Sequence, residues 1–399
     1  MRESVIVSAV RLPTGKFLGS LSSLPATDLG SRVIREAVTR AGIETTVVDE
    51  CIMGNVVSAG LGQAPARQAA LKGGLGPEVG ALTINKVCGS GLKAVMLAAQ
   101  GIATGDIDVA VAGGMESMSN CPYLFPDGRN GLRMGDGKLL DSMMHDGLWC
   151  AVEHWSMGLA AEAVVEQYGI SRQDQDTFAA CSHQKAATAI REHAFTEEIL
   201  PVNVPQRKGN PIRLEHDESV RVDSTAEALS KLRPAFKKDG GTVTAGNAPG
   251  VNDGAAALVV MSAERAKVLG VQPLARIVGQ AVSGRPAKWL LMTPVESVQK
   301  LLKKISWSLD DVDLIELNEA FSAQSLGCIR EWGLADDDVR INPNGGALAL
   351  GHPLGMTGTR ILQTAALDLQ RKQKKYALVT MCVGVGQGYA VIIENINNY

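Results

Sequence analysis

One pattern occurs twice in the chain and limits what it can fold into: a Gly-rich turn, an Ala-rich helix, a charged turn, an apolar strand and a Gly-rich end. The first copy spans residues 87–114 and the second spans residues 351–386. In the first copy, Leu92–Ala103 has good helix propensity. Val109–Ala112 is a short apolar run typical of a strand buried on both faces. The repeat is approximate, and it predicts two similar α/β halves whose equivalent loops meet at a shared cleft.

The remaining patterns divide the chain into three parts. Residues 1–118 alternate strands and helices, beginning with a strand at Val5–Val10 and a helix at Asp28–Ala41, and we expect residues 250–270 to complete this first half. Residues 119–249 lose the alternation. An excursion rich in Met, Gly, Pro and Asp is followed there by helices and polar loops, as in an inserted domain. Residues 271–399 return to the α/β pattern and form the second half.

Composition narrows the possible partners. The 399 residues carry 39 Lys and Arg against 42 Asp and Glu, and no basic stripe stands out, so nucleic acid and anionic membranes are poor candidates. No apolar run approaches the ~18 residues of a membrane span, and the N-terminus leaves no room for a signal peptide. The seven cysteines are scattered and have no metal-ligand spacing, so we expect free thiols, no metal site and a cytoplasmic location.

Cys88 is the first candidate reactive group. It stands just before the turn Gly89-Ser90-Gly91 and the Ala-rich helix. The positive end of the helix dipole favours a thiolate at such a position, and we expect it to depress the pKa of Cys88. A buried structural cysteine beside a Gly-rich turn explains the same pattern equally well, because free cysteine is among the most buried residue types.

Three further groups lie at predicted strand ends and Gly-rich turns: Asn318, His352 and Cys382. A nucleophilic thiol needs a neighbour that activates it, and imidazole is the usual one. A second thiol suits reversible proton transfer at a carbon acid, and the amides of Cys88 and Gly384 could hold an oxyanion. Taken singly, each has an ordinary structural explanation: a packed histidine, a buried thiol and a turn asparagine.

The chain resembles the thiolase family over essentially its whole length. The motifs that carry the resemblance occur in the family's order: Asn85–Gly91 around the first cysteine, Gly113–Ser119, Lys231–Phe236, Thr242–Asn247, Asn318–Phe321, Gly351–Pro353 and the loop after Cys382. The resemblance implies a five-layered α/β/α/β/α fold of two similar halves, with residues 119–249 as a CoA-binding loop domain that includes a tetramerisation segment.

The resemblance also implies roles. Cys88 would carry the acyl group as a thioester, His352 would activate it, and Asn318 would hold a water beside His352. Cys382 would move the α-proton in a Claisen condensation or its reverse, and the amide of Gly384 would help to hold the oxyanion. Coenzyme A and acetyl-CoA would be substrates, with no bound cofactor. The residues expected to contact CoA are Leu148, Met157, Arg221, Ala245, Gly250, Ala320 and Phe321.

Three departures from the family's usual residues bear on the substrate: Ser156, Pro249 and Val385, the last of which adds a side chain near the active site. With these departures, two substrate ranges remain open: that of a short-chain enzyme acting on acetoacetyl-CoA, and that of a degradative 3-ketoacyl-CoA thiolase of broader chain length. A protein that binds CoA or lipid without catalysis would be expected to have lost a catalytic group. A ketoacyl synthase acting on carrier-bound chains would have no second catalytic cysteine. We therefore expect a homo-oligomeric, tetrameric acyltransferase acting on acyl-CoA.

Overall fold

The first half of the chain forms a mixed sheet whose strand order differs from the chain order. A computed structural model describes residues 2–205 and 209–396. In this half the order is β1–β12–β5–β3–β4, with antiparallel pairing from β1 to β5 and parallel pairing from β5 to β4. The strands are β1 Ser4–Arg11, β3 Glu50–Gly54, β4 Gly80–Ile84, β5 Val109–Ser117 and β12 Asn252–Ser262.

The second half repeats this arrangement. Its order is β13–β16–β15–β14, antiparallel from β13 to β15 and parallel between β15 and β14. The strands are β13 Ala275–Gly284, β14 Leu314–Leu317, β15 Tyr376–Val383 and β16 Gln387–Glu394. In this topology β5 corresponds to β15 and β3 to β14, as the repeated sequence pattern predicts. The two sheets join where Val5 and Ile6 of β1 pair with Arg276 and Ala275 of β13.

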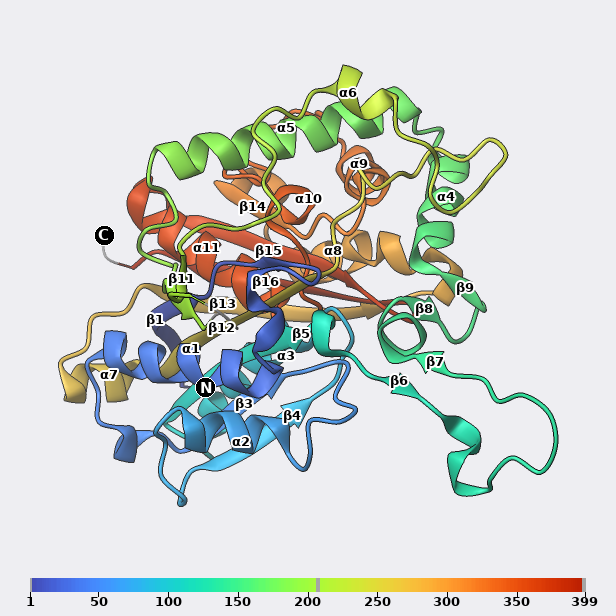
Figure 1. Cartoon of the computed structure of the whole chain (residues 1–399). Coiled ribbons are helices and arrows are strands. Elements are labelled where there is room, and N and C mark those ends of the chain that lie inside the picture. The colour runs from blue at the N-terminus through green and yellow to red at the C-terminus, as the bar shows by residue number, and fades with distance from the viewer. Residues whose placement is uncertain (1, 206–208, 397–399) are drawn as a thin grey trace.

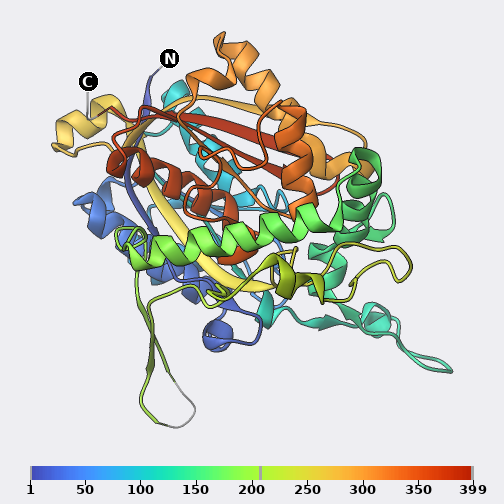
Figure 2. The same ribbon diagram turned by 90° about the horizontal axis from the view of Figure 1, so that it is seen from above.

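Helices separate and cover the two sheets, and this gives five layers (Figure 1, Figure 2). Helices α3 (Ser90–Thr104) and α11 (Thr357–Arg371) lie between the sheets and contact each other. Helices α1 (Ala26–Ala41) and α2 (Pro65–Lys72) cover the outer face of the first sheet, and α8 (Thr293–Ile305) covers that of the second. The predicted α/β/α/β/α architecture is confirmed.

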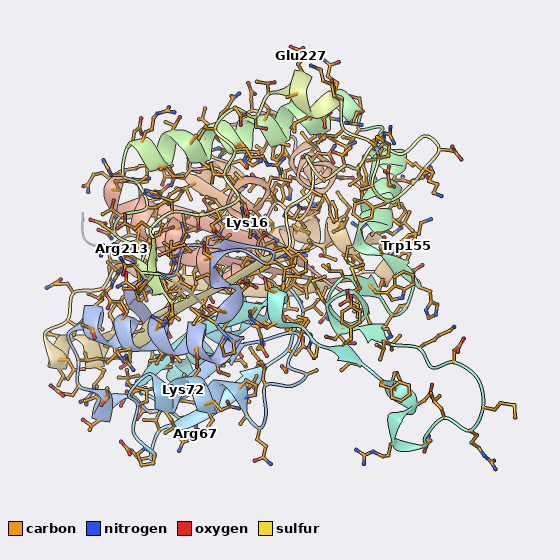
Figure 3. The ribbon with its side chains drawn as sticks, in the orientation of Figure 1. Lys16, Arg67, Lys72, Trp155, Arg213 and Glu227 are labelled. Atoms are coloured by element: carbon orange, nitrogen blue, oxygen red, sulfur yellow. The ribbon has the colours of Figure 1, made fainter. Side chains whose placement is uncertain are left out.

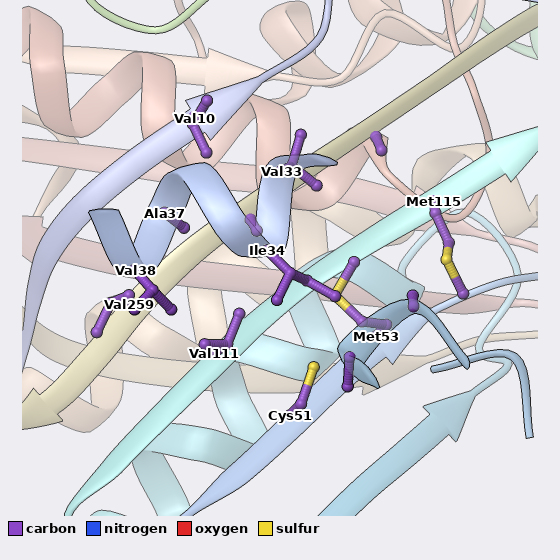
Figure 4. Packing of buried hydrophobic residues seen from close by; sticks show 14 of the residues in the cluster. Val10, Val33, Ile34, Ala37, Val38, Cys51, Met53, Val111, Met115 and Val259 are labelled. Carbon is purple, nitrogen blue, oxygen red and sulfur yellow. The ribbon is translucent and has the colours of Figure 1, made fainter. Parts of the chain in front are cut away.

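Apolar side chains join neighbouring layers, and along each helix they recur at the spacing that places them on one face. In α1, Val33, Ile34, Ala37 and Val38 face the sheet at helical intervals. Figure 4 shows them against Val111 of β5 and Val259 of β12. Charged side chains such as Lys72, Arg213 and Glu227 are exposed, and Glu227 stands at the upper edge of the molecule in Figure 3. Both signs are spread over the surface, in keeping with the balanced composition.

The segment between β5 and β12 lies mainly over the second half. Its helices α4 (Met157–Tyr168) and α5 (Arg172–Arg191) pack on α9 (Ser322–Glu331), and α5 also contacts α10 (Ala347–Leu350). Around β6, a long connection projects from the body in both views (Figure 1, Figure 2). The shorter elements are α6 Ala226–Ser230, α7 Ala263–Leu269, β2 Gly15–Lys16, β6 Tyr123–Leu124, β7 Leu140–Asp141, β8 Trp149–Cys150, β9 Trp155–Ser156, β10 Val202–Val204 and β11 Ile212–Leu214.

The N-terminal ends of α3 and α11 approach so closely that glycine is required in both. A Cβ on Gly358 would lie 2.5 Å from the backbone nitrogen of Leu92, and one on Gly91 would lie 2.8 Å from the carbonyl oxygen of Gly355. These distances are too short for any side chain, so the pair of glycines sets the spacing of the central layer. The spacing in turn fixes the loops that precede the two helices.

One local expectation was wrong. Strand β5 does not end at Ala112 but continues through Gly113 and Gly114 to Ser117, because these residues stay paired with β12. The Gly-rich turn that begins the second copy of the repeat lies between the short helix α10 and helix α11.

Among the described residues, Val87–Thr104, which contains α3, has the length and hydropathy of a membrane-spanning helix. The window contains Ser90, Lys93 and Gln100, so it is not an uninterrupted apolar run. Because α3 packs between the two sheets, burial in the central layer accounts for its apolar composition.

We predict that Gly358→Ala lowers the free energy of unfolding by about 1–3 kcal/mol, since the new methyl group overpacks the contact with Leu92. Urea denaturation followed by circular dichroism measures this. Gly80→Ala is the matched control, because a Cβ there meets nothing closer than 3.8 Å. Equal stability of the two variants would contradict the close-approach argument.

Candidate active site

Cys88 is presented by a tightly bonded loop at the start of α3. Asn85 Oδ1 accepts a hydrogen bond from the Val87 amide at 3.0 Å, and Ser90 Oγ donates to the Val87 carbonyl at 2.7 Å. Ser90 Oγ also accepts from the Lys86 amide at 2.8 Å. These bonds hold Val87 at φ 47°, in the left-handed region that a β-branched residue rarely adopts. The kink turns Cys88 toward the second half.

The electrostatics of Cys88 differ from the sequence-based expectation. Burial raises the pKa of Cys88 to about 11, although the backbone amides of Cys88 and Gly384 act on the sulfur in the opposite direction. The expectation that the helix terminus would lower the pKa of Cys88 was therefore wrong. Desolvation of the thiolate raises the pKa by more than the local dipoles lower it. The thiol is protonated near neutral pH and needs a base to react.

His352 follows α10 on a loop that leaves its Nε2 free. Its Nδ1 lies 2.7 Å from Thr357 Oγ1, which donates its own hydrogen to the Pro353 carbonyl at 2.8 Å. Thr357 therefore accepts from His352 Nδ1–H, and this assigns the tautomer in which Nε2 carries the lone pair. Nε2 is buried without a partner. Burial, with a smaller contribution from Arg360, lowers the pKa of His352 to about 3, so the imidazole is neutral.

Three side chains from other elements hold the backbone of helix α10 and of the His352 loop that follows it. Asn252 Oδ1 accepts from the His352 amide at 3.0 Å, Glu116 Oε2 from the Gly355 amide at 2.8 Å, and Glu319 Oε2 from the Leu348 amide at 3.1 Å. Glu116 also accepts from the amides of Val56 and Val57. Burial raises the pKa of Glu116 to about 7. The loop is thus tied to both halves of the fold.

Cys382 and Gly384 come from the end of β15 and the turn into β16. Burial raises the pKa of Cys382 well above its ordinary value, and the neighbouring Cys88 raises it further. The two thiols are therefore close enough to influence each other's titration. A Cβ on Gly384 would lie 2.8 Å from Cγ1 of Val87, so the loops of Cys88 and Cys382 are in contact.

Asn318 follows β14, and its backbone amide donates to the Thr380 carbonyl at 3.0 Å. Its side chain is fully buried, and both Oδ1 and Nδ2 lack a hydrogen-bond partner. Buried amides are normally satisfied by protein groups or ordered water. The side-chain amide of Asn318 can therefore bind a water molecule or a polar atom of a substrate.

Most of the sequence-predicted residues line one cavity of about 260 Å³. Cys88, His352, Cys382 and Gly384 line it. Of the residues predicted to contact CoA, five line it as well: Leu148, Met157, Gly250, Ala320 and Phe321. The other two, Arg221 and Ala245, lie outside this wall and contact each other, Arg221 Nη2 donating to the Ala245 carbonyl at 3.5 Å. Asn318 also lies outside the wall.

Sequence reasoning missed the residues that position the site. Glu116 was noticed only as part of a motif, and Thr357 and Asn252 were not singled out. A buried pair, Glu316 and Arg360, also lies near the site, with 3.6 Å between Oε2 and Nη1. The only sequence signals for Glu116 and Glu316 are a charge inside or at the end of an apolar strand.

Similarity to known proteins covers almost the whole chain. Residues 4–264 match the family model described as thiolase, N-terminal domain, and residues 271–395 match thiolase, C-terminal domain. The chain is 52% identical over 393 residues to an acetyl-CoA acetyltransferase of Pseudomonas aeruginosa, covering 98% of this chain and 99% of the relative. It is 52% identical over 398 residues to one of Escherichia coli, covering both chains fully. The crystal structure of the Bacillus anthracis acetyl-CoA acetyltransferase superposes with a TM-score of 0.96 at 43% identity, with 99% of each chain covered.

We predict that Thr357→Val lowers the kcat of acyl transfer about 10–100-fold, part of the 10²–10⁴-fold contribution of a positioned general base. The reason is that Nδ1–H loses its acceptor and the imidazole no longer favours the tautomer with a free Nε2. We expect the substitution to lower kcat and to leave KM and the melting temperature nearly unchanged.

Thr357→Ser keeps the hydroxyl and should restore most of the rate. Thr359→Val is the matched control, because the Thr359 hydroxyl is buried without a partner. A Thr357→Val enzyme with unchanged kcat, or one that loses rate only through unfolding, would refute the positioning role.

Proposed function

The chain belongs to the thiolase family, and we propose that it is an acetyl-CoA C-acetyltransferase. The reaction is the reversible Claisen condensation of two acetyl-CoA molecules to acetoacetyl-CoA and CoA. The observation that carries the proposal is the meeting of two thiols, a neutral imidazole and two backbone amides around one cavity. Curated relatives with about half of their residues identical carry the name of this activity.

In the first half-reaction, Cys88 Sγ attacks the carbonyl carbon of acetyl-CoA. His352 Nε2 takes the thiol proton, because a thiol with a raised pKa needs a base and this nitrogen carries a free lone pair. The negative charge that develops on the carbonyl oxygen lies near the amides of Cys88 and Gly384. The bond from the carbonyl carbon to the CoA sulfur breaks, Cys382 gives its proton to the departing sulfur, and the acetyl group stays on Cys88.

In the second half-reaction, the Cys382 thiolate takes a proton from the α-carbon of a second acetyl-CoA. The resulting carbanion attacks the thioester carbon on Cys88, a carbon–carbon bond forms, and the bond to Cys88 Sγ breaks. Cys88 recovers its proton from His352, which returns all groups to their starting state. Asn318 holds a water beside His352, and this pair receives the thioester oxygen of the second substrate.

The apolar cavity wall carries the pantetheine arm in this proposal, and Arg221 and Ala245 contact the CoA molecule farther out, beyond the cavity. We also propose a cytoplasmic homotetramer that needs no metal. The seven cysteines are all free thiols, as in a reducing compartment. The projecting connection around β6 exposes large apolar side chains, among them Tyr123 and Met134, which suits contact with a second dimer. A role in CoA or lipid binding alone leaves the two thiols and the imidazole without a purpose.

We predict that Cys382→Ala still forms acyl-enzyme from labelled acetyl-CoA but loses exchange of the α-protons with D₂O by at least about 10²-fold, the contribution of a general base. Cys121→Ala is the control, since that partly buried thiol does not line the cavity. Mass spectrometry measures both steps, alongside thiolysis of acetoacetyl-CoA by the wild-type enzyme. Exchange at the wild-type rate in Cys382→Ala would assign the base elsewhere, and absence of wild-type thiolysis would overturn the proposed function.

A further inference from the structure

Asn252, the first residue of β12, is a buried junction of three segments that lie far apart in the chain. Its Nδ2 donates to the Gly15 carbonyl and to Ser219 Oγ, each at 3.0 Å, and its Oδ1 accepts from the His352 amide at 3.0 Å. Both amide hydrogens and the carbonyl oxygen of the side chain are therefore in use. The three partners belong to the first half of the fold, to the inserted segment and to the second half.

Glycine at position 351 lets Asn252 reach the histidine loop. Gly351 has φ 91°, in the left-handed region that favours glycine. A Cβ at this position would lie 2.6 Å from Oδ1 of Asn252. Because that distance is too short, any side chain here would displace Asn252 from the amide of the next residue, His352. The glycine thus permits the contact that holds the catalytic histidine.

Ser219 belongs to a loop that is fixed at one end and exposed at the other. The amide of its neighbour Glu218 donates to the Thr14 carbonyl at 3.0 Å. Two residues after Ser219, the exposed side chain of Arg221 reaches the Ala245 carbonyl. Arg221 and Ala245 are the groups proposed above to contact CoA beyond the reaction cavity. A ligand bound there acts on the same short loop that Asn252 contacts.

A second set of contacts leads from Arg221 toward the same catalytic loop. The Arg221 amide donates to Nδ1 of His183 at 3.1 Å, and His183 follows Ser182 on α5. Ser182 Oγ accepts from the Gly346 amide at 3.0 Å, immediately before α10. The loop around Arg221 is therefore connected to the second half of the fold at two points, before α10 and at His352 itself.

We propose that Asn252 is a positioning residue through which the nucleotide part of CoA improves the placement of His352. This inference rests on the proposed function. It deepens that function, because it gives the part of the substrate that does not react an effect on kcat as well as on binding. The nucleotide orders the exposed loop at Arg221, the loop fixes Ser219, and Asn252 carries this order to the backbone that presents the imidazole.

The physical basis is the use of remote binding energy. Contacts with a part of the substrate that does not react can supply the free energy that orients the reacting groups. The nucleotide part of CoA takes no part in the bond changes, yet its loop is one side chain away from the His352 backbone. Small displacements of a catalytic group matter, since a misplacement of about 1 Å can cost about 10²-fold in rate.

Ser219→Ala tests the proposal, because it removes the hydroxyl that Asn252 contacts and leaves the bond from Asn252 to the His352 amide. Two thiolysis reactions are compared: acetoacetyl-CoA with CoA, and acetoacetyl-pantetheine with pantetheine, which lacks the nucleotide. We expect kcat of the CoA reaction to fall about 3–10-fold, the effect of one hydrogen bond. We expect kcat of the pantetheine reaction to stay within about twofold, since no nucleotide orders the loop there. Ser219→Thr keeps the hydroxyl and should restore most of the CoA rate.

Ser230→Ala is the matched control in the same inserted segment. Its hydroxyl donates to the Glu227 carbonyl at 2.8 Å inside α6, and we expect both reactions to be unchanged. Asn252→Ala removes both contacts, so both reactions slow and the ratio of their kcat values falls to that of Ser219→Ala. In the double variant the ratio should fall no further, because both substitutions break one connection. The melting temperature of each variant shows that it is folded.

The outcomes separate this inference from the proposed function. Equal wild-type kcat for the CoA and pantetheine reactions overturns the coupling and leaves the proposed function standing. An equal loss in both reactions in Ser219→Ala also overturns it and assigns Ser219 a structural role. A higher KM for acetoacetyl-CoA at unchanged kcat overturns it as well, since the loop then only binds CoA. Absence of acetoacetyl-CoA thiolysis by the wild-type enzyme contradicts the proposed function itself.

Discussion

The contact between the N-terminal ends of α3 and α11 determines the geometry of the site. Gly91 and Gly358 let the two helices meet at backbone distance between the sheets, and each helix follows a loop that carries a reactive group. Cys88 precedes α3, and His352 precedes α11. A side chain at either glycine would separate the two loops. The packing of the central layer, which is a requirement of stability, is therefore also what brings the thiol and the imidazole together.

Burial of the two thiols and the imidazole near this contact sets the protonation states on which the chemistry depends. Desolvation raises the pKa of both thiols and lowers that of the imidazole, so all three groups are neutral before substrate binds. Proton transfers must then accompany each bond change, and the tautomer fixed by Thr357 decides where the first proton goes. Glu116 and Glu319 hold the surrounding loop through backbone amides and act on the reaction through that positioning.

The sequence points to candidate reactive groups because they belong to local motifs. Cys88, His352 and Cys382 stand in Gly-rich turns at element ends, and the repeated pattern indicates that those turns meet. What it could not predict depends on contacts between distant segments. Asn252 and Glu116 hold the backbone of the His352 loop from strands that are far away in the sequence. The pKa of Cys88 was expected to fall because only the helix dipole is visible in the sequence, whereas desolvation comes from the whole fold. The left-handed conformations of Val87 and Val385 likewise carry no sequence signal.

The central claim is that Cys88 alone becomes acylated, with Cys382 handling protons beside it. Brief incubation of the wild-type enzyme with isotope-labelled acetyl-CoA, acid quenching and peptide mass spectrometry test this directly. The account predicts label on the peptide containing Cys88, at close to one acetyl group per active site, and none on the peptide containing Cys382. Label on Cys382, or no covalent adduct while thiolysis proceeds, would contradict it.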